Sequence, residues 1–231
     1  MHRVALLMLV FCSATALAQS TNLPSPVDAD AFRNEATAQY RKILAALSAK
    51  GKLDDDEVLL ARIRRVAAGL IVVAAQIRPE TSAWSWEIHV TSDVSKGALC
   101  MAGGKLLVGS ELVRRLGLSD GELAMLLGHE IAHAVAGHRR EVARAGMEAD
   151  VAQEIRQAEI AVREENEADE IGMRLAYRAG WPASSLVSFY EKLSAEESPG
   201  TFNSSHPSAA SRAATARAMA QQLGSQARRA Q

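Results

Sequence analysis

His129-Glu130-Ile131-Ala132-His133 lies near the end of an apolar run that extends from Leu123 to Ala136. Two histidines four positions apart on an α-helix lie one turn apart on nearly the same face, so both imidazole rings can reach one metal ion. Glu130 follows the first histidine directly and can take a proton from a water molecule at that ion. The spacing therefore predicts a zinc site of the hydrolase type that needs a third protein ligand. A chance match on an ordinary amphipathic helix is the alternative.

The composition limits the classes of protein that this chain can belong to. It has 231 residues, a formal net charge of −1, 48% hydrophobic residues and 4% aromatic residues. This length suits one domain with its own core. Proteins that bind nucleic acid or anionic lipid usually carry a basic excess, and stacking on bases needs aromatic side chains. We therefore expect a soluble globular protein with no nucleic-acid partner.

The first residues differ in character from the rest of the chain. Arg3 gives a positively charged start, residues 4–11 are apolar, and Ala16-Leu17-Ala18 is a small-x-small cleavage site. Because Phe11 rather than a small residue precedes Cys12, a lipid anchor is the weaker alternative. These features predict a signal peptide at residues 1–18 and a single domain at 19–231, with its core at about 28–223. The mature protein is then exported, and we expect it in the periplasm.

The predicted mature chain has neither a disulfide nor a membrane span. Removal of the signal peptide leaves Cys100 as the one cysteine. The most apolar later window, residues 67–77, is much shorter than the roughly 20 residues that a bilayer-spanning helix needs. The oligomeric state cannot be predicted from these observations.

Hydrophobic periodicity divides the mature chain into helices and a few strands. Apolar and polar residues alternate from Trp84 to Val90 as in a half-buried strand, and Gly103-Gly104 separates two further strands in a predicted hairpin. Ser119 and Glu122 match a capping box at the start of the motif helix. The pattern predicts helices at 28–50, 58–77, 119–138, 141–179, 182–195 and 207–223, and strands at 84–90, 98–101 and 105–108. The predicted fold class is α+β, mostly helical, with a small antiparallel sheet.

The third metal ligand is expected among the acidic residues of the long helix that follows the motif. Glu165 and Asp169 are four positions apart, so one carboxylate could bind the metal while the other accepts the free N–H of a ligand histidine. A solvated helix face is the alternative for any one of these acids. His138 is a competing ligand, but a metzincin would have glycine and histidine where this chain has Ala136 and Arg139. We therefore expect His138 to lie at the end of the motif helix without binding the metal.

Three motifs occur in a fixed order along the chain. They are His129-Glu-Ile-Ala-His133 with Gly137-His138, then Glu165-Asn-Glu-Ala-Asp169-Glu-Ile-Gly, and then His206-Pro-Ser with Arg212 downstream. Together they resemble the gluzincin metallopeptidases related to the CAAX prenyl protease, HtpX and the BepA-like periplasmic proteases. The resemblance covers about residues 83–212, and this chain looks like a soluble, single-domain version of those enzymes.

The resemblance implies a zincin-like metallopeptidase domain and a role for each motif. One zinc ion per chain would be bound by His129, His133 and Glu165, with Asp169 supporting a ligand histidine. Glu130 would be the general base that takes a proton from water and passes it to the leaving amine.

Two later residues are candidates for stabilising the tetrahedral intermediate of peptide hydrolysis, namely His206 and Arg212. His206 could instead occupy the open position of the zinc ion when no substrate is present. An extended polypeptide substrate could add to an exposed sheet edge at residues 98–101, although this strand could equally be an ordinary part of the hairpin.

Three functional hypotheses follow. The first is an exported zinc metalloendopeptidase that cleaves unfolded or misassembled envelope proteins, a substrate class that rests on the resemblance alone. The second is a proteolytically silent, chaperone-like or interaction module that binds zinc in a closed site. The third is a helical interaction protein with a chance motif, which would bind no metal.

Overall fold

The computed structural model describes residues 26–93, 97–138, 151–196 and 208–229. The predicted signal peptide, the start of the helix predicted at 141–179 and residue His206 lie outside these ranges. Within them the elements are α1 (Pro26–Ser48), α2 (Glu57–Ile77), a 3-10 helix (Pro79–Ala83), β1 (Glu87–Thr91), β2 (Ala98–Met101), β3 (Lys105–Gly109), α3 (Ser110–Arg115), α4 (Asp120–Ala136), α5 (Val151–Arg178), α6 (Ala183–Glu196) and α7 (Ala209–Arg229). The predicted α+β class, mostly helical with a small sheet, is confirmed.

The sheet is mixed, which corrects the prediction that it is antiparallel. Its strand order is β1-β3-β2. The hairpin partners β2 and β3 are antiparallel, as expected, but β1 pairs with β3 in the parallel direction. The chain crosses from β1 to the opposite edge before it returns through the centre as β3. Alternation of polar and apolar residues predicts where strands lie but contains no information on this order.

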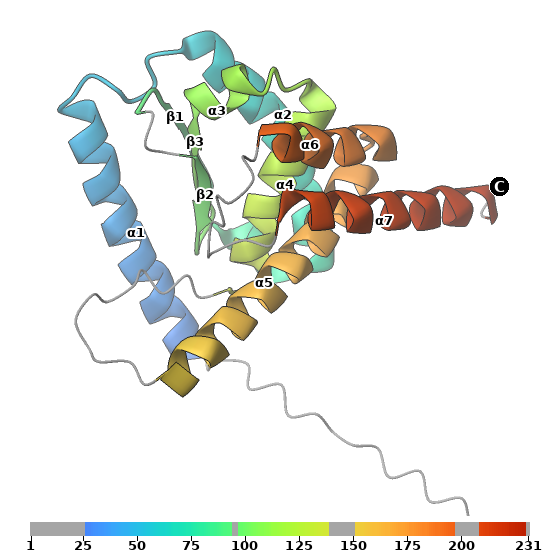
Figure 1. Cartoon of the computed structure of the whole chain (residues 1–231). Coiled ribbons are helices and arrows are strands. Elements are labelled where there is room, and N and C mark those ends of the chain that lie inside the picture. The colour runs from blue at the N-terminus through green and yellow to red at the C-terminus, as the bar shows by residue number, and fades with distance from the viewer. Residues whose placement is uncertain (1–25, 94–96, 139–150, 197–207, 230–231) are drawn as a thin grey trace, which may run out of the picture.

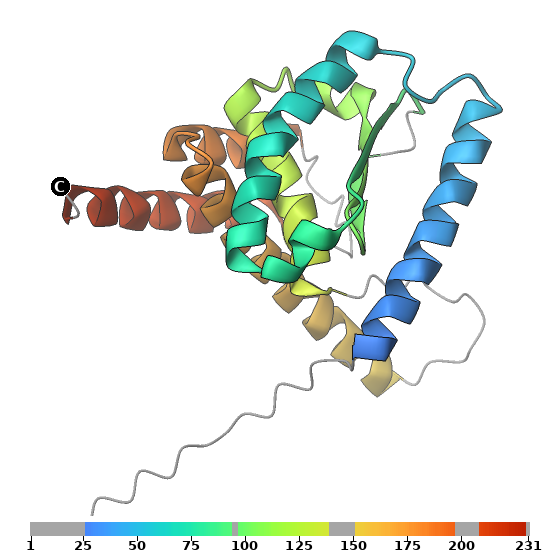
Figure 2. The ribbon, with the colours of Figure 1, turned by 180° about the vertical axis from the view of Figure 1, so that it is seen from behind.

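Helices cover both faces of the sheet, so that the central strand β3 is buried on each side (Figure 1). On one face Leu107 packs with Tyr40 and Leu47 of α1, and the Tyr40 hydroxyl donates to the carbonyl oxygen of Leu106 over 2.6 Å. On the other face Leu106 and Val108 belong to the main core, which α2 and α4 share. Figure 2 shows the same order from behind, with the sheet between α1 and the other helices.

The motif helix α4 is buried from Gly121 to Val135 and lies at the centre of the helical layer. It begins with the predicted capping box, in which Ser119 and Glu122 bond to each other's backbone N–H. The Glu122 carboxylate also accepts hydrogen bonds from Lys192 and Ser188 of α6. The start of α4 is thereby fixed to its neighbours, and α2, α5 and α6 pack around the helix, while α7 packs on α5 and α6. None of the helices in the described ranges has a stretch long and apolar enough to cross a membrane.

Candidate metal centre

Helices α4 and α5 approach each other at two glycines beside the motif. A Cβ atom added to Gly172 would lie 2.7 Å from the backbone nitrogen of His129, and one added to Gly128 would lie 2.8 Å from the carbonyl oxygen of Gly172. A Cβ atom cannot be accommodated at such distances, so only glycine permits this contact between the backbones. Asp169 and Glu165 lie one and two turns before Gly172 on the same face of α5. The close crossing therefore directs both carboxylates toward the histidines of α4.

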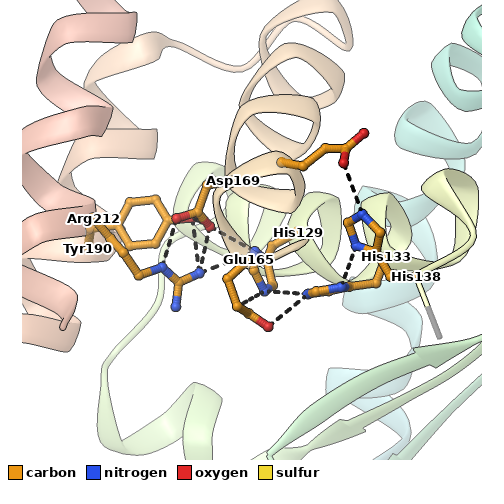
Figure 3. A network of polar contacts seen from close by, with 8 residues as sticks. His129, His133, His138, Glu165, Asp169, Tyr190 and Arg212 are labelled. Carbon is orange, nitrogen blue, oxygen red and sulfur yellow. Dashed lines mark hydrogen bonds and ion pairs between the residues drawn. The ribbon is translucent and has the colours of Figure 1, made fainter. Parts of the chain in front are cut away.

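Three donor atoms converge between these helices (Figure 3). The Nε2 atoms of His129 and His133 are 3.1 Å apart. Oε2 of Glu165 lies 3.3 Å from Nε2 of His129, and Oε1 of Glu165 lies 3.3 Å from Nε2 of His133. Zinc bonds of about 2.0–2.1 Å in tetrahedral geometry place neighbouring donors roughly 3.3 Å apart. All three residues are buried, and a carboxylate and two imidazoles form a donor set that suits zinc. The predicted ligand residues are thus brought together with the spacing that a zinc ion requires.

The protonation of the two rings is consistent with a site built for a cation. Burial disfavours a charged ring, yet hydrogen bonds with Asp169 and Glu165 raise the pKa of His129 above its ordinary value. Burial lowers the pKa of His133, against the opposing effect of Glu165. Two Nε2 atoms only 3.1 Å apart cannot both carry protons directed at each other. A metal ion would satisfy both lone pairs and the carboxylate at once.

Asp169 orients His129 from the side of the ring that faces away from Glu165. The Nδ1 atom of His129 donates to Asp169 Oδ1 over 2.8 Å, which leaves the Nε2 lone pair directed at Glu165 and His133. The same carboxylate accepts hydrogen bonds from the Arg212 guanidinium at 2.6 and 2.8 Å and from the Tyr190 hydroxyl. Burial alone would raise the pKa of Asp169, but its hydrogen bonds with Arg212 and His129 lower it to about 2. Asp169 is therefore ionised at neutral pH, as an acceptor for a ligand histidine should be.

His133 has a different partner. Its Nδ1 atom lies 2.9 Å from Nδ1 of His138, and Nε2 of His138 lies 3.4 Å from a carboxylate oxygen of Glu167. Gly137 ends α4 in the left-handed conformation with φ +73°, and the backbone N–H of His138 returns to the carbonyl oxygen of His133 over 3.0 Å. This is the Schellman pattern of helix termination, and it turns His138 back toward the metal site.

Glu130 is buried on α4 between the two histidines, with 5% of its surface exposed. Its negative charge is felt by both rings, where it opposes the effect of burial on their pKa values. A buried carboxylate beside three converging donors is in the place that a general base would occupy.

The remaining predicted residues have different outcomes. Asp169 contacts a ligand histidine, as expected. Arg212 lies on the Nδ1 side of His129, with a guanidinium nitrogen 3.2 Å from that atom, and it binds Asp169. This position differs from the expected one beside an oxyanion, and that role stays a prediction. The roles of His206 also stay predictions, because the residue lies outside the described ranges.

Sequence reasoning missed two contributions to the site. Tyr190 is a buried residue of α6 that carries no motif, and only the folded structure brings it to Asp169. His138 was expected at the helix end, where it lies, but not against His133. The Gly137-His138 pair was the available signal for that contact, because a glycine after a helix often turns the chain back on itself.

With this geometry in view, comparison with known proteins identifies the family. The family model of peptidase family M48 matches residues 59–150 and 142–220, which include the motif helix, Glu165 and Arg212. The chain belongs to peptidase family M48. The predicted relation to gluzincin metallopeptidases and the predicted zinc cofactor are therefore confirmed, and the prediction of a metallopeptidase agrees with the family.

The chain is also similar to two mitochondrial metalloendopeptidases named OMA1. The protein of Arabidopsis thaliana is 29% identical over 143 residues, which are 54% of this chain and 29% of the relative. The protein of Schizosaccharomyces pombe is 28% identical over 173 residues, which are 65% of this chain and 50% of the relative. The matched region of this M48 chain thus spans half or less of the length of these relatives.

Proposed function

We propose that this M48 protein is a zinc endopeptidase that hydrolyses internal peptide bonds of polypeptides. The observation that carries the proposal is the convergence of His129, His133 and Glu165, whose ligand atoms all lie within 4.8 Å of one another, with Glu130 buried on the motif helix. The names of the two relatives, which are metalloendopeptidases, support internal cleavage over removal of terminal residues.

Each residue of the site has its own role in the proposed reaction. His129, His133 and Glu165 would hold zinc, which when bound supplies Lewis-acid chemistry that activates water and polarises the substrate carbonyl. Glu130 accepts a proton from the attacking water and delivers it to the leaving amine nitrogen. Asp169, held by Arg212 and Tyr190, keeps the Nδ1 proton of His129 in place, so that Nε2 of this ring is available as a ligand.

The edge strand β2 offers a place for an extended substrate. The strand order β1-β3-β2 leaves one side of β2 without a strand partner among the described residues, and β2 packs against the motif helix α4. An extended polypeptide that pairs with this edge would lie beside the metal site through backbone hydrogen bonds, with little demand on its side chains. Proline substitutions over residues 97–101 should each lower kcat/KM for an unfolded substrate. Unchanged cleavage by correctly folded variants would exclude this mode of binding.

The test of the proposed activity is digestion of casein by the purified zinc-loaded protein. Glu130→Gln should keep its zinc and lose activity by about 10²–10⁴-fold, because only the proton acceptor is removed. Glu111→Gln, at an exposed glutamate of α3, is the matched control and should cleave casein normally. An active Glu130→Gln variant would contradict the assigned role. Bound zinc without any cleavage by the wild-type protein would favour the silent chaperone-like module instead.

We also propose that the protein is exported to the periplasm and acts on unfolded or misassembled envelope proteins. The charged start, apolar stretch and small-x-small site of residues 1–18 support export, and the substrate class is supported by the family resemblance of the motifs. The mature protein isolated from cells should begin at Gln19 and be recovered with the periplasmic fraction. A protein that retains residues 1–18 and stays in the cytoplasmic fraction would refute this part of the proposal.

A further inference from the structure

The two histidine ligands are supported by partners of different chemistry. The Nδ1–H group of His129 donates a hydrogen bond to the carboxylate of Asp169, the usual kind of partner for a histidine that binds metal. His133 faces another imidazole, that of His138, over 2.9 Å. In a hydrogen bond between two ring nitrogens one must donate and the other must accept.

The surroundings decide which ring donates. If Nε2 of His133 is a metal ligand, its proton lies on Nδ1, which must then donate to Nδ1 of His138. The remaining proton of a neutral His138 is on Nε2, which faces the Glu167 carboxylate at 3.4 Å. Both N–H groups in this arrangement therefore have an acceptor. His133 is linked to the Glu167 carboxylate through the ring of His138.

The backbone holds His138 in this position. Gly137 adopts φ +73°, a conformation that residues with a side chain rarely adopt, and the N–H of His138 bonds to the carbonyl oxygen of His133. The His138 side chain is only 6% exposed, whereas that of Glu167 is 53% exposed. His138 is thus the enclosed partner of His133, whereas water can replace the exposed Glu167 carboxylate as the acceptor of the His138 Nε2–H group.

We propose that His138 is a positioning residue for zinc, which fixes His133 in the tautomer that presents Nε2 to the ion. It touches the ligand and not the zinc or the substrate. This inference rests on the zinc site of the proposed function but not on peptide hydrolysis, and its readout is metal affinity. Loss of the acceptor should therefore weaken zinc binding even in a protein that cleaves nothing.

The test is the dissociation constant of zinc, measured by competition with a chelator at neutral pH. His138→Leu should weaken zinc binding by about 10–100-fold, the range found for partners of metal ligands. His138→Asn keeps an oxygen near the place of Nδ1 and should recover most of the affinity. His89→Asn is the matched control, because His89 pairs with Asp54 over 2.6 Å in β1 and is not part of the metal site. The control should bind zinc like the wild type.

The outcomes separate this inference from its alternatives. Wild-type affinity in folded His138→Leu would overturn it, and equal losses in the Leu and Asn variants would show that ring packing, not an acceptor, is what matters. If His138→Leu does not fold, nitrogen-15 NMR of the zinc-loaded wild type decides. The expected spectrum has the His133 proton on Nδ1 and a metal-bound Nε2, and the opposite tautomer would refute the assignment. A wild type that binds zinc but lacks peptidase activity would leave the inference standing and refute the proposed function.

Discussion

Two buried glutamates of the helical layer, Glu122 and Glu165, have partners of different kinds. At the start of α4, Glu122 is 3% exposed and accepts hydrogen bonds from Lys192, Ser188 and Ser119 at 2.5–2.8 Å. At the other end, Glu165 is 5% exposed and faces the Nε2 atoms of His129 and His133. The first cluster contains its own cation, whereas the second places three donors around a point that a cation can fill.

The difference teaches how to tell a structural acid from a functional one. Burial and carboxylate chemistry are the same in both clusters, so neither identifies the metal site. The distinguishing feature is the partner, because a buried carboxylate paired with lysine is already neutralised, while one that converges with two imidazoles attracts a metal ion. The comparison predicts that the Glu122 cluster contributes stability and the Glu165 cluster contributes zinc binding.

The largest effect is expected at Glu165. Glu165→Ala removes a ligand, so zinc affinity should fall by more than the roughly 10–100-fold that loss of an outer partner costs, and casein cleavage should stop. Zinc content after dialysis and casein digestion measure the two properties, and circular dichroism checks that the variant is folded. An Ala variant that keeps zinc and activity would remove Glu165 from the metal site.

Acid should destabilise both clusters in the absence of zinc. The pKa of Asp169 is about 2, because hydrogen bonds with Arg212 and His129 outweigh burial, and that of Glu122 is also about 2, because Lys192 and Ser188 outweigh it. Both values lie below those of the unfolded chain, so the stabilisation is complete above about pH 4–5 and is lost as the pH falls toward 2. Asp169 should account for roughly 2–3 kcal/mol of the free energy of unfolding, and Glu122 for about 1–2 kcal/mol, because the Lys192 side chain that pairs with it is 37% exposed.

Urea unfolding in chelator between pH 5 and 2.5 measures this loss, and Glu122→Gln provides the comparison. That variant should show a shallower decline, since one of the two groups no longer titrates. An identical decline in wild type and variant would mean that Glu122 is not the ionised partner of Lys192.

A smaller effect is expected for Glu122→Gln at neutral pH. Glutamine keeps most of the shape but leaves Lys192 without its carboxylate, and because the Lys192 side chain is 37% exposed, water compensates in part. The unfolding free energy should fall by about 1–2 kcal/mol, with the zinc dissociation constant unchanged. A folded Glu122→Gln variant with weakened zinc binding would break the division between the two clusters.

The smallest effect is expected for Tyr190→Phe. The hydroxyl of Tyr190 is one of several donors to Asp169, and Arg212 remains in place when it is removed. Loss of one hydrogen bond should cost about 1 kcal/mol of stability and at most a few-fold in zinc affinity. Zinc titration and urea unfolding of the same samples test both values, and a complete loss of zinc would place Tyr190 closer to the metal than the structure does.

The sequence predicts the parts of this protein that have local signals. The apolar run around the motif, the capping box at Ser119 and the glycines that end helices each depend on neighbours a few positions away, and these elements were predicted correctly. The pairing of Glu165 with the motif came from the family resemblance, since spacing alone left Glu165 and Asp169 interchangeable.

The parts that could not be predicted depend on contacts between distant segments. The parallel pairing of β1 with β3 is set by the path of the chain between strands, and alternation does not encode it. The placement of Arg212 behind His129 results from the docking of α7 onto α5 and α6, which no local pattern around Arg212 reveals. The sequence made Arg212 a candidate residue of the site, but only the fold shows that its guanidinium lies on the Nδ1 side of the His129 ring.

The position of Arg212 along the chain has a consequence for protein synthesis. It follows His129 by 83 positions and reaches Asp169 from α7, so a ribosome completes the motif helix and Glu165 well before it adds the arginine. A nascent or prematurely terminated chain that lacks α7 has no guanidinium to neutralise the acid behind His129. The support behind His129 is therefore completed late in synthesis, when α7 docks and Arg212 reaches Asp169.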